Sequence, residues 1–182
     1  KISPADGEIL ARGSNIARGY WRRPRATEEL WLSDGWFATG DIGKLDEDGY
    51  LYITDRKKEL IVSSGGKKVA PAFLEGRIKS SRYISHAFVF GDQKPFLVAL
   101  LTLELPAVKS WAAKTELAAY TDEQLPFQPA VEELLAAEIE RFNQDLSSYE
   151  QVKKFVILNE DFTVENGLLS PTLKLRRKLI VE

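Results

Sequence analysis

The pattern of apolar residues changes at Asp55-Arg56-Lys57-Lys58, and this change constrains the fold more than any other feature of the sequence. Before this charged segment, Tyr50–Thr54 alternates with the period of two that is typical of a strand, and turn sequences such as Asp46–Gly49 separate short apolar segments. From Glu59 onward, strand-like segments alternate with segments of helical periodicity. The sequence therefore predicts an α+β protein in two parts. The first part is β-rich, and the second, of about 125 residues, is large enough to have its own core.

Turn residues bound the expected elements in both parts. In the first part, the sequence predicts strands at 7–11, 36–37, 42–45 and 50–54, and a short helix at 26–32 after an arginine-rich surface loop. In the second part, it predicts strands at 60–62, 87–90, 96–103 and 155–158, and helices at 71–80, from 106, at 130–147 and from 171. The helix at 130–147 is the clearest, because its apolar residues recur at helical spacing with glutamates between them. We expect a short central antiparallel sheet flanked by helices.

Composition excludes several classes of site. The chain has no cysteine, so disulfides, thiolate zinc sites and a cysteine nucleophile are excluded. Its single histidine, His86, has no evident partner in the sequence, and we expect it to be structural. The formal net charge of -2 gives no electrostatic argument for a nucleic-acid partner. No apolar segment approaches the roughly 20 residues that a membrane-spanning helix needs. Because the chain begins at Lys1 and lacks methionine, we expect it to be a fragment.

Four short motifs contain candidate binding or catalytic residues, and each motif also has a purely structural interpretation. Asp41, after Gly40, would suit the two hydroxyls of a ribose, or it caps its own turn. Arg56 and its basic neighbours would bind phosphate or ribose oxygens, or they form a solvated turn. The segment Gly65-Gly66-Lys67 would favour an anion, although it lacks the spacing of a Walker A loop. Lys174 would deliver a positive charge to a carboxylate or phosphate, or it belongs to a basic helix end.

The order and spacing of these motifs point to a family. The segments 35–41 (GWFATGD), 49–61 (GYLYITDRKKELI), 64–71 (SGGKKVAP) and 169–174 (LSPTLK) together resemble the C-terminal third of the AMP-forming acyl-CoA synthetases. Within this adenylate-forming superfamily, the sequence is most similar to the long-chain fatty acyl-CoA synthetase branch. The resemblance implies that residues 1–57 end a large adenylation domain with a distorted β-barrel. It also implies that residues 58–182 form a mobile C-terminal domain.

The resemblance also implies a reaction and its residues. ATP and a fatty acid carboxylate would give an acyl-adenylate, and coenzyme A would then displace AMP. By motif, Asp41 would bind the ribose hydroxyls with support from Arg56, and Lys58 would be the hinge. The Gly65-Gly66 loop with Lys67 would approach the coenzyme A path, and Lys174 would be catalytic. Mg²⁺ is expected with ATP, bound mainly outside this chain.

One departure from the family pattern concerns the residue before the catalytic lysine. Leu173 stands where the family usually has glycine, which leaves Arg176 and Lys178 as alternatives to Lys174. Glu75 occupies a family helix position that we expect to be structural.

The resemblance leaves other expectations open. The family's phosphate-binding loop and acyl pocket would precede Lys1, so we expect the chain alone to be inactive. We expect a cytoplasmic location, and the sequence leaves peripheral membrane association and the oligomeric state open. We expect no metal site within the chain and no nucleic-acid partner. Two alternatives remain at this point. One is an acyl-AMP ligase or another carboxylate-activating relative. The other is an autonomous anion-binding module, whose affinity for polyanions would depend on salt.

Overall fold

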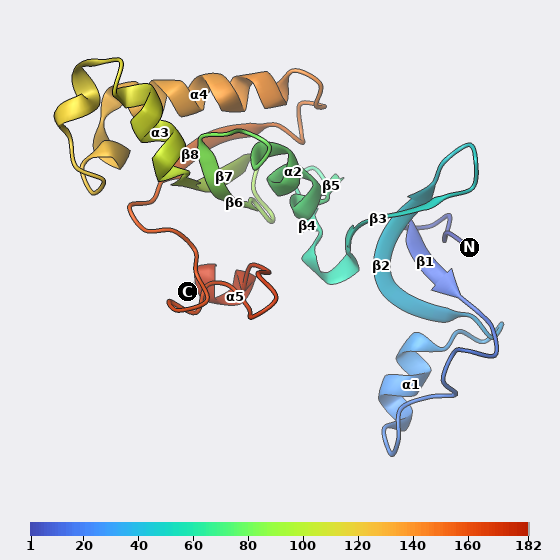
Figure 1. Ribbon diagram of the computed structural model, residues 1–182. Coiled ribbons are helices and arrows are strands. Elements are labelled where there is room, and N and C mark those ends of the chain that lie inside the picture. The colour runs from blue at the N-terminus through green and yellow to red at the C-terminus, as the bar shows by residue number, and fades with distance from the viewer. Residues whose placement is uncertain (182) are drawn as a thin grey trace. The chain divides into compact units, whose positions relative to one another are not determined.

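The computed structural model describes residues 1–181, and the chain divides into two compact units, Lys1–Leu60 and Ile61–Glu182 (Figure 1). Glu182, the last residue of the predicted second domain, lies outside the described residues. Helices and antiparallel strand pairs occur in both units, which confirms the α+β class. Within residues 1–181, no helix is both long and apolar enough to span a bilayer.

The first unit is built on a three-stranded antiparallel sheet. Its strands are β1 (Glu8–Ala11), β2 (Phe37–Leu45) and β3 (Leu51–Arg56), in the order β1-β2-β3. The two short strands predicted at 36–37 and 42–45 are one continuous strand, β2, with a register shift between Ile42 and Gly43. Glycine is required at this irregularity, since a Cβ on Gly43 would lie 2.6 Å from the carbonyl oxygen of Tyr52.

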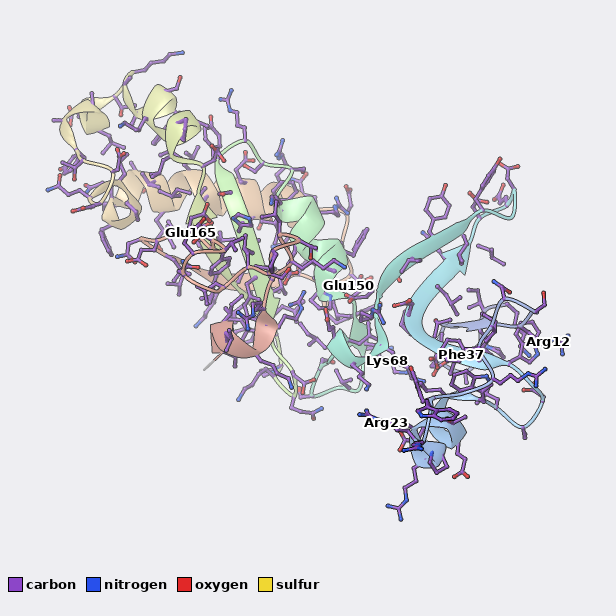
Figure 2. All side chains as sticks on the ribbon, turned by 60° about the horizontal axis from the view of Figure 1, so that its bottom comes forward. Arg12, Arg23, Phe37, Lys68, Glu150 and Glu165 are labelled. Carbon is purple, nitrogen blue, oxygen red and sulfur yellow. The ribbon has the colours of Figure 1, made fainter. Side chains whose placement is uncertain are left out.

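A short helix and an aromatic contact complete the first unit. Helix α1 (Pro24–Leu30) begins two residues earlier than predicted. Proline fits its first turn, where the missing N–H has no partner to lose. Trp31 follows the helix, and its ring lies 4.6 Å from that of Phe37, which begins β2 and is labelled in Figure 2. The unit ends in a 3₁₀ helix, η1 (Lys57–Glu59).

The second unit contains a hairpin, a mixed sheet and several helices. The hairpin joins β4 (Ile61–Val62) to β5 (Lys68–Val69), and the sheet has the order β6-β7-β8. The sheet strands are β6 (Ile84–Phe90), β7 (Leu97–Leu103) and β8 (Val152–Ile157). The helices are α2 (Pro71–Ile78), α3 (Leu105–Ala112), α4 (Pro129–Asn143) and α5 (Arg177–Val181), with 3₁₀ turns η2 (Glu116–Ala119) and η3 (Leu125–Phe127).

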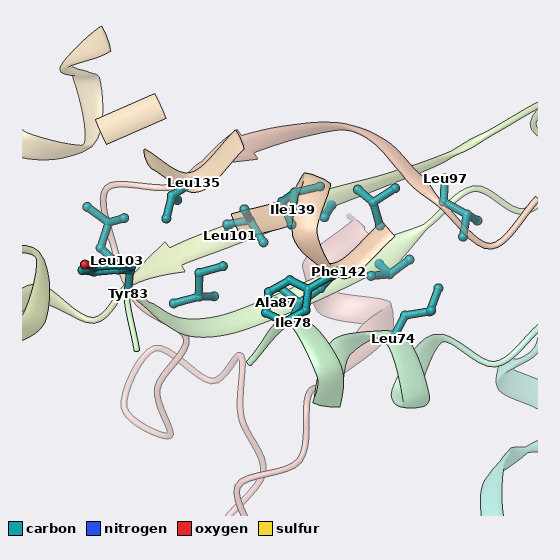
Figure 3. Packing of buried hydrophobic residues seen from close by; sticks show 14 of the residues in the cluster. Leu74, Ile78, Tyr83, Ala87, Leu97, Leu101, Leu103, Leu135, Ile139 and Phe142 are labelled. Carbon is teal, nitrogen blue, oxygen red and sulfur yellow. The ribbon is translucent and has the colours of Figure 1, made fainter. Parts of the chain in front are cut away.

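The predicted antiparallel pairing holds for β6 and β7, whereas β8 joins β7 in parallel. A parallel neighbour needs a long crossover, and the segment from α3 to α4 provides it. Residues on one face of the sheet pack against α2, α3 and α4, and Leu101, Val108 and Leu135 are almost completely buried there. Leu101 and Leu135 are labelled in the close view of this core (Figure 3). In Figure 1, α4 runs along this side of the sheet.

The other face of the sheet is covered by the chain after β8. Phe88 on β6 is buried with Phe162 and Leu169 of this C-terminal segment, and Leu100 on β7 packs against the same cluster. Because both faces are buried, β7 is apolar at nearly every position instead of alternating. The prediction that a helix begins at Pro171 is wrong. Pro171–Lys174 forms a turn, and α5 begins only at Arg177.

Candidate functional site

Asp41 and Arg56 face each other across neighbouring strands of the first unit. They are paired in the antiparallel register of β2 and β3, and Arg56 Nε lies 2.8 Å from Asp41 Oδ1. The Asp41 side chain is 23% exposed, so its carboxylate is partly covered but reachable. A carboxylate has about four acceptor positions, so one ion pair leaves room for hydroxyl donors. The structure thus brings together two residues that the sequence motifs presented separately.

A buried carboxylate, Glu8, contacts the backbone of Gly40 and the side chain of Lys57, the chain neighbours of this pair. Glu8 Oε1 accepts a hydrogen bond from Gly40 N (2.8 Å), and Lys57 Nζ lies 2.6 Å from Glu8 Oε2. Lys57 Nζ also contacts Asp6 Oδ2 at 2.7 Å. Gly40 precedes Asp41 in the chain and Lys57 follows Arg56, so this network fixes the positions of both site residues.

Sequence analysis missed this network. The available signal was the alternation in β1, where Glu8 shares the buried face with Leu10. Four residues of strand are too few to show which face is buried.

The contacts of Lys57 shift two pKa values. Its hydrogen bond, together with one from Ser3, lowers the pKa of Asp6 to about 2. The hydrogen bonds to Asp6 and Glu8 raise the pKa of Lys57 above its ordinary value. Both members of the Asp6–Lys57 pair are therefore charged at neutral pH.

Lys58 lies in the middle of η1, and its side chain is exposed. The two units divide two residues later, between Leu60 and Ile61. Rotation about a few backbone bonds at the end of an element is the usual form of a hinge. The role of Lys58 as a hinge stays a prediction.

Gly65, Gly66 and Lys67 form the turn of the β4–β5 hairpin in the second unit. Gly66 N donates to Ser63 O (2.8 Å), and Lys67 N donates to Ser63 Oγ (3.1 Å). Gly66 has φ +75°, a conformation that favours glycine. The turn is exposed, as is its neighbour Lys68, which is labelled in Figure 2.

Lys174 lies near the tip of a tight, exposed loop in the C-terminal segment. An isolated β-bridge between Leu169 and Leu175 closes the loop. Inside it, Ser170 N donates to Lys174 O (2.8 Å) and Lys174 N donates to Ser170 Oγ (3.1 Å). Leu173 has φ +57°, which a residue with a side chain rarely adopts. The loop backbone at Leu173 therefore lies in the left-handed region that favours glycine.

His86, for which the sequence shows no evident partner, has one in the structure. Its Nδ1 lies 2.8 Å from Asp161 Oδ1, and Ser85 Oγ donates to Asp161 Oδ2 (2.6 Å). Burial raises the pKa of Asp161, but hydrogen bonds from Ser85, Thr102 and His86 outweigh this and lower it overall. Asp161 follows His86 by 75 residues, so no local pattern could reveal the contact.

Metal ligands are not clustered in the part of the chain that the structure describes. No group of three or more His, Cys, Asp or Glu side chains there is placed to hold a metal ion.

The family described as AMP-binding enzyme C-terminal domain matches residues 58–166. The chain belongs to the AMP-binding enzymes. Among them, long-chain-fatty-acid–CoA ligase FadD15 of Mycobacterium tuberculosis is 46% identical over 180 residues, 97% of this chain and 30% of the relative. Long-chain-fatty-acid–CoA ligase 6 of Homo sapiens is 38% identical over 176 residues, 94% of this chain and 25% of the relative. The chain thus spans less than a third of these relatives.

Solved structures of AMP-binding enzymes share the fold. The adenylation domain of a carboxylate reductase from Mycobacterium chelonae has a TM-score of 0.75 and 26% identity, covering 96% of this chain and 26% of that chain. O-succinylbenzoate coenzyme A synthetase from Bacillus subtilis, in complex with AMP, has a TM-score of 0.64 and 27% identity. That comparison covers 96% of this chain and 30% of the synthetase. These comparisons confirm the predicted adenylate-forming family. They also confirm that the chain is similar to long-chain fatty acid–CoA ligases.

Proposed function

We propose that this chain is the C-terminal part of an ATP-dependent long-chain fatty acid–CoA ligase. In the first half-reaction, the fatty acid carboxylate attacks the α-phosphate of ATP, giving acyl-adenylate and pyrophosphate. In the second, the thiol of coenzyme A attacks the acyl carbon, forming the thioester and releasing AMP. Similarity to FadD15 over 97% of the chain carries the proposal. Mg²⁺ would accompany ATP, bound mainly by residues outside this chain.

Asp41 and Arg56 would hold the ribose of the nucleotide. The Asp41 carboxylate would accept hydrogen bonds from the two ribose hydroxyls, as a carboxylate with free acceptor positions can. Arg56, whose Nε lies 2.8 Å from Asp41 Oδ1, orients the Asp41 carboxylate. The Glu8 contact to Gly40 supports this role, because it fixes the backbone next to Asp41.

Lys174 would act in adenylation. Two negatively charged groups, the carboxylate and the α-phosphate, must approach each other, and a lysine ammonium offsets the charge between them. Two observations support Lys174 over its basic neighbours. Leu173 before it has a glycine-like φ, and Arg176 donates to the carbonyl oxygen of Gly167 (3.2 Å) within its own loop. Lys178 lies within α5.

The two half-reactions would use different faces of a mobile domain. We assign residues 1–57 to the large adenylation domain and 58–182 to the mobile C-terminal domain, with Lys58 as the hinge. Movement would withdraw Lys174 after adenylation and bring Gly65, Gly66 and Lys67 toward the coenzyme A thiol. The exposed position of this turn, and its small glycine residues, support that assignment.

Lys174→Ala in the proposed ligase tests this function. We expect the variant to lose fatty-acid-dependent ATP–pyrophosphate exchange by about 100-fold or more, because one positioned charge commonly contributes that much. Thioester formation from supplied acyl-adenylate should change little. Lys178→Ala is the matched control and should retain both half-reactions. Equal losses of both half-reactions in Lys174→Ala would refute the assignment.

A carboxylate-activating relative other than a coenzyme A ligase is a second candidate, favoured by the similarity to carboxylate reductase adenylation domains. Acyl-adenylate formation without thioester formation from coenzyme A would identify it. We also expect the 182-residue chain alone to show no ATP–pyrophosphate exchange, and measurable exchange would contradict this. Peripheral membrane association stays a proposal that co-sedimentation with lipid vesicles tests.

A further inference from the structure

The loop that carries Lys174 has little structure of its own, so its position depends on contacts outside it. Residues 158–176 contain no helix or strand apart from the Leu169–Leu175 bridge. The segment nevertheless lies in a defined place, covering the face of the sheet opposite to α4. Two polar contacts and one apolar cluster attach it there.

The first contact is centred on Asp161, which precedes the loop. Its carboxylate accepts hydrogen bonds from Ser85 on β6 and Thr102 on β7, and it faces His86 Nδ1. It also accepts from the backbone N–H of Phe162 (2.8 Å). One side chain therefore binds two neighbouring strands of the sheet and fixes the chain where it turns back across them.

The second contact is made by Arg177, directly after the loop. Both terminal nitrogens of its guanidinium bind the carboxylate of Glu75 on α2, with Arg177 Nη1 2.9 Å from Glu75 Oε1. Glu75 Oε1 also accepts from Val89 N on β6 (2.8 Å), and the guanidinium lies over the ring of Phe88, 5.4 Å from its centroid. The two side chains are only 20% and 9% exposed. Such a two-point contact fixes the orientation of the Arg177 guanidinium as well as its distance from the Glu75 carboxylate.

The apolar cluster lies between the two polar contacts. Phe162 and Leu169 are buried against Phe88, and Leu175 packs at the edge of the same cluster. Leu169 and Leu175 are also the two bridge partners that close the Lys174 loop. The base of the loop is therefore fixed, while its tip is exposed.

We propose that Asp161 and Arg177 are positioning residues, which hold the Lys174 loop against the sheet in the place that adenylation requires. Arg177 follows Lys174 by three residues, a span of at most about 11 Å of chain, so release of its contact would let the lysine move by several ångströms. A displacement of about 1 Å at a reacting group can cost roughly 100-fold in rate. The proposal rests on the proposed function and extends it to residues that do not touch substrate.

The first test measures the loop in the 182-residue chain and needs no activity. Amide hydrogen exchange of residues 168–176 should accelerate by about tenfold or more in Arg177→Gln and in Asp161→Asn, while β7 amides keep their protection. Arg141→Gln is the matched control, since it breaks an exposed ion pair with Glu138 on α4. Unchanged exchange in the loop, or equal acceleration in β7, would overturn the proposal.

The second test uses the proposed ligase and separates the half-reactions. Arg177→Gln should lower ATP–pyrophosphate exchange by about tenfold or more and leave thioester formation from supplied acyl-adenylate nearly unchanged. Arg177→Lys, which keeps the charge but loses the two-point contact, should fall between Arg177→Gln and the parent. Equal loss in both half-reactions, or no loss in either, would refute the positioning role. If the parent enzyme lacks adenylation activity, the proposed function is refuted instead. The amide hydrogen exchange experiment would then still decide whether Asp161 and Arg177 position the loop.

Discussion

Leu173 provides a direct test of backbone strain beside Lys174. At φ +57°, the clash of a Cβ atom with the following carbonyl costs about 1–2 kcal/mol. The greater freedom of glycine in the unfolded chain offsets about 0.5–1 kcal/mol of this. Leu173 is 70% exposed, so Leu173→Gly and Leu173→Ala both lose little burial. We therefore expect the glycine variant to be more stable than the alanine variant by about 0.5–1 kcal/mol.

Urea unfolding of the 182-residue chain, followed by circular dichroism, measures this difference. In a chain of this size, the difference corresponds to roughly 1–4 °C in Tm. Ala137, exposed in the interior of α4, supplies the control. There, Ala137→Gly should lose about 1 kcal/mol, because glycine is unfavourable inside a helix. The strain argument fails if Leu173→Ala is as stable as Leu173→Gly while Ala137→Gly shows its expected loss.

Two further predictions concern the first unit and the hairpin turn. Because the Lys57 contact lowers the pKa of Asp6 to about 2, its stabilisation is present above the unfolded value of 3.8 and is lost as pH falls toward 2. Lys57→Met should raise the pKa of Asp6 toward 3.8 in a carboxyl NMR titration, and an unchanged value would show that Lys57 is not the cause. In the hairpin, Gly66→Ala should cost about 1 kcal/mol, since φ +75° disfavours a side chain although no atom lies within 4 Å of the added Cβ. Gly65→Ala, where φ lies outside that region, should be neutral or stabilising in thermal unfolding, and equal losses at both positions would contradict the reasoning.

The parts of the fold that the sequence predicted well are those with local patterns. The apolar spacing of Val131–Phe142 identifies α4 because a helix repeats every 3.6 residues, and α4 ends four residues before the predicted end. The alternation at Tyr50–Thr54 identifies β3 in the same way. The parallel pairing of β8 has no such signal, since it depends on a crossover of nearly 50 residues between β7 and β8.

The candidate site shows the same division. The family resemblance implied that Arg56 supports Asp41, and adjacent strands joined by a short turn place the two residues opposite each other. The contacts that fix the Lys174 loop were missed, because they join residues 75 and 102 positions apart. A single sequence shows which side chains can form such pairs, but not which do.

The error at Pro171 shows how tertiary contacts decided the conformation of this loop. Proline followed by leucine, lysine and arginine residues favours the start of a helix, and the sequence alone predicts one there. In the structure, the Leu169–Leu175 bridge and the burial of Leu169 hold the chain in a turn instead, with Leu173 in a left-handed conformation. The helix begins at Arg177, the residue that binds Glu75. Lys174 consequently projects from a loop whose conformation is imposed at its base, and releasing that base should favour the helix that the local sequence prefers. Circular dichroism of Arg177→Gln would then show slightly greater helicity, whereas unchanged or lower helicity would contradict this reasoning.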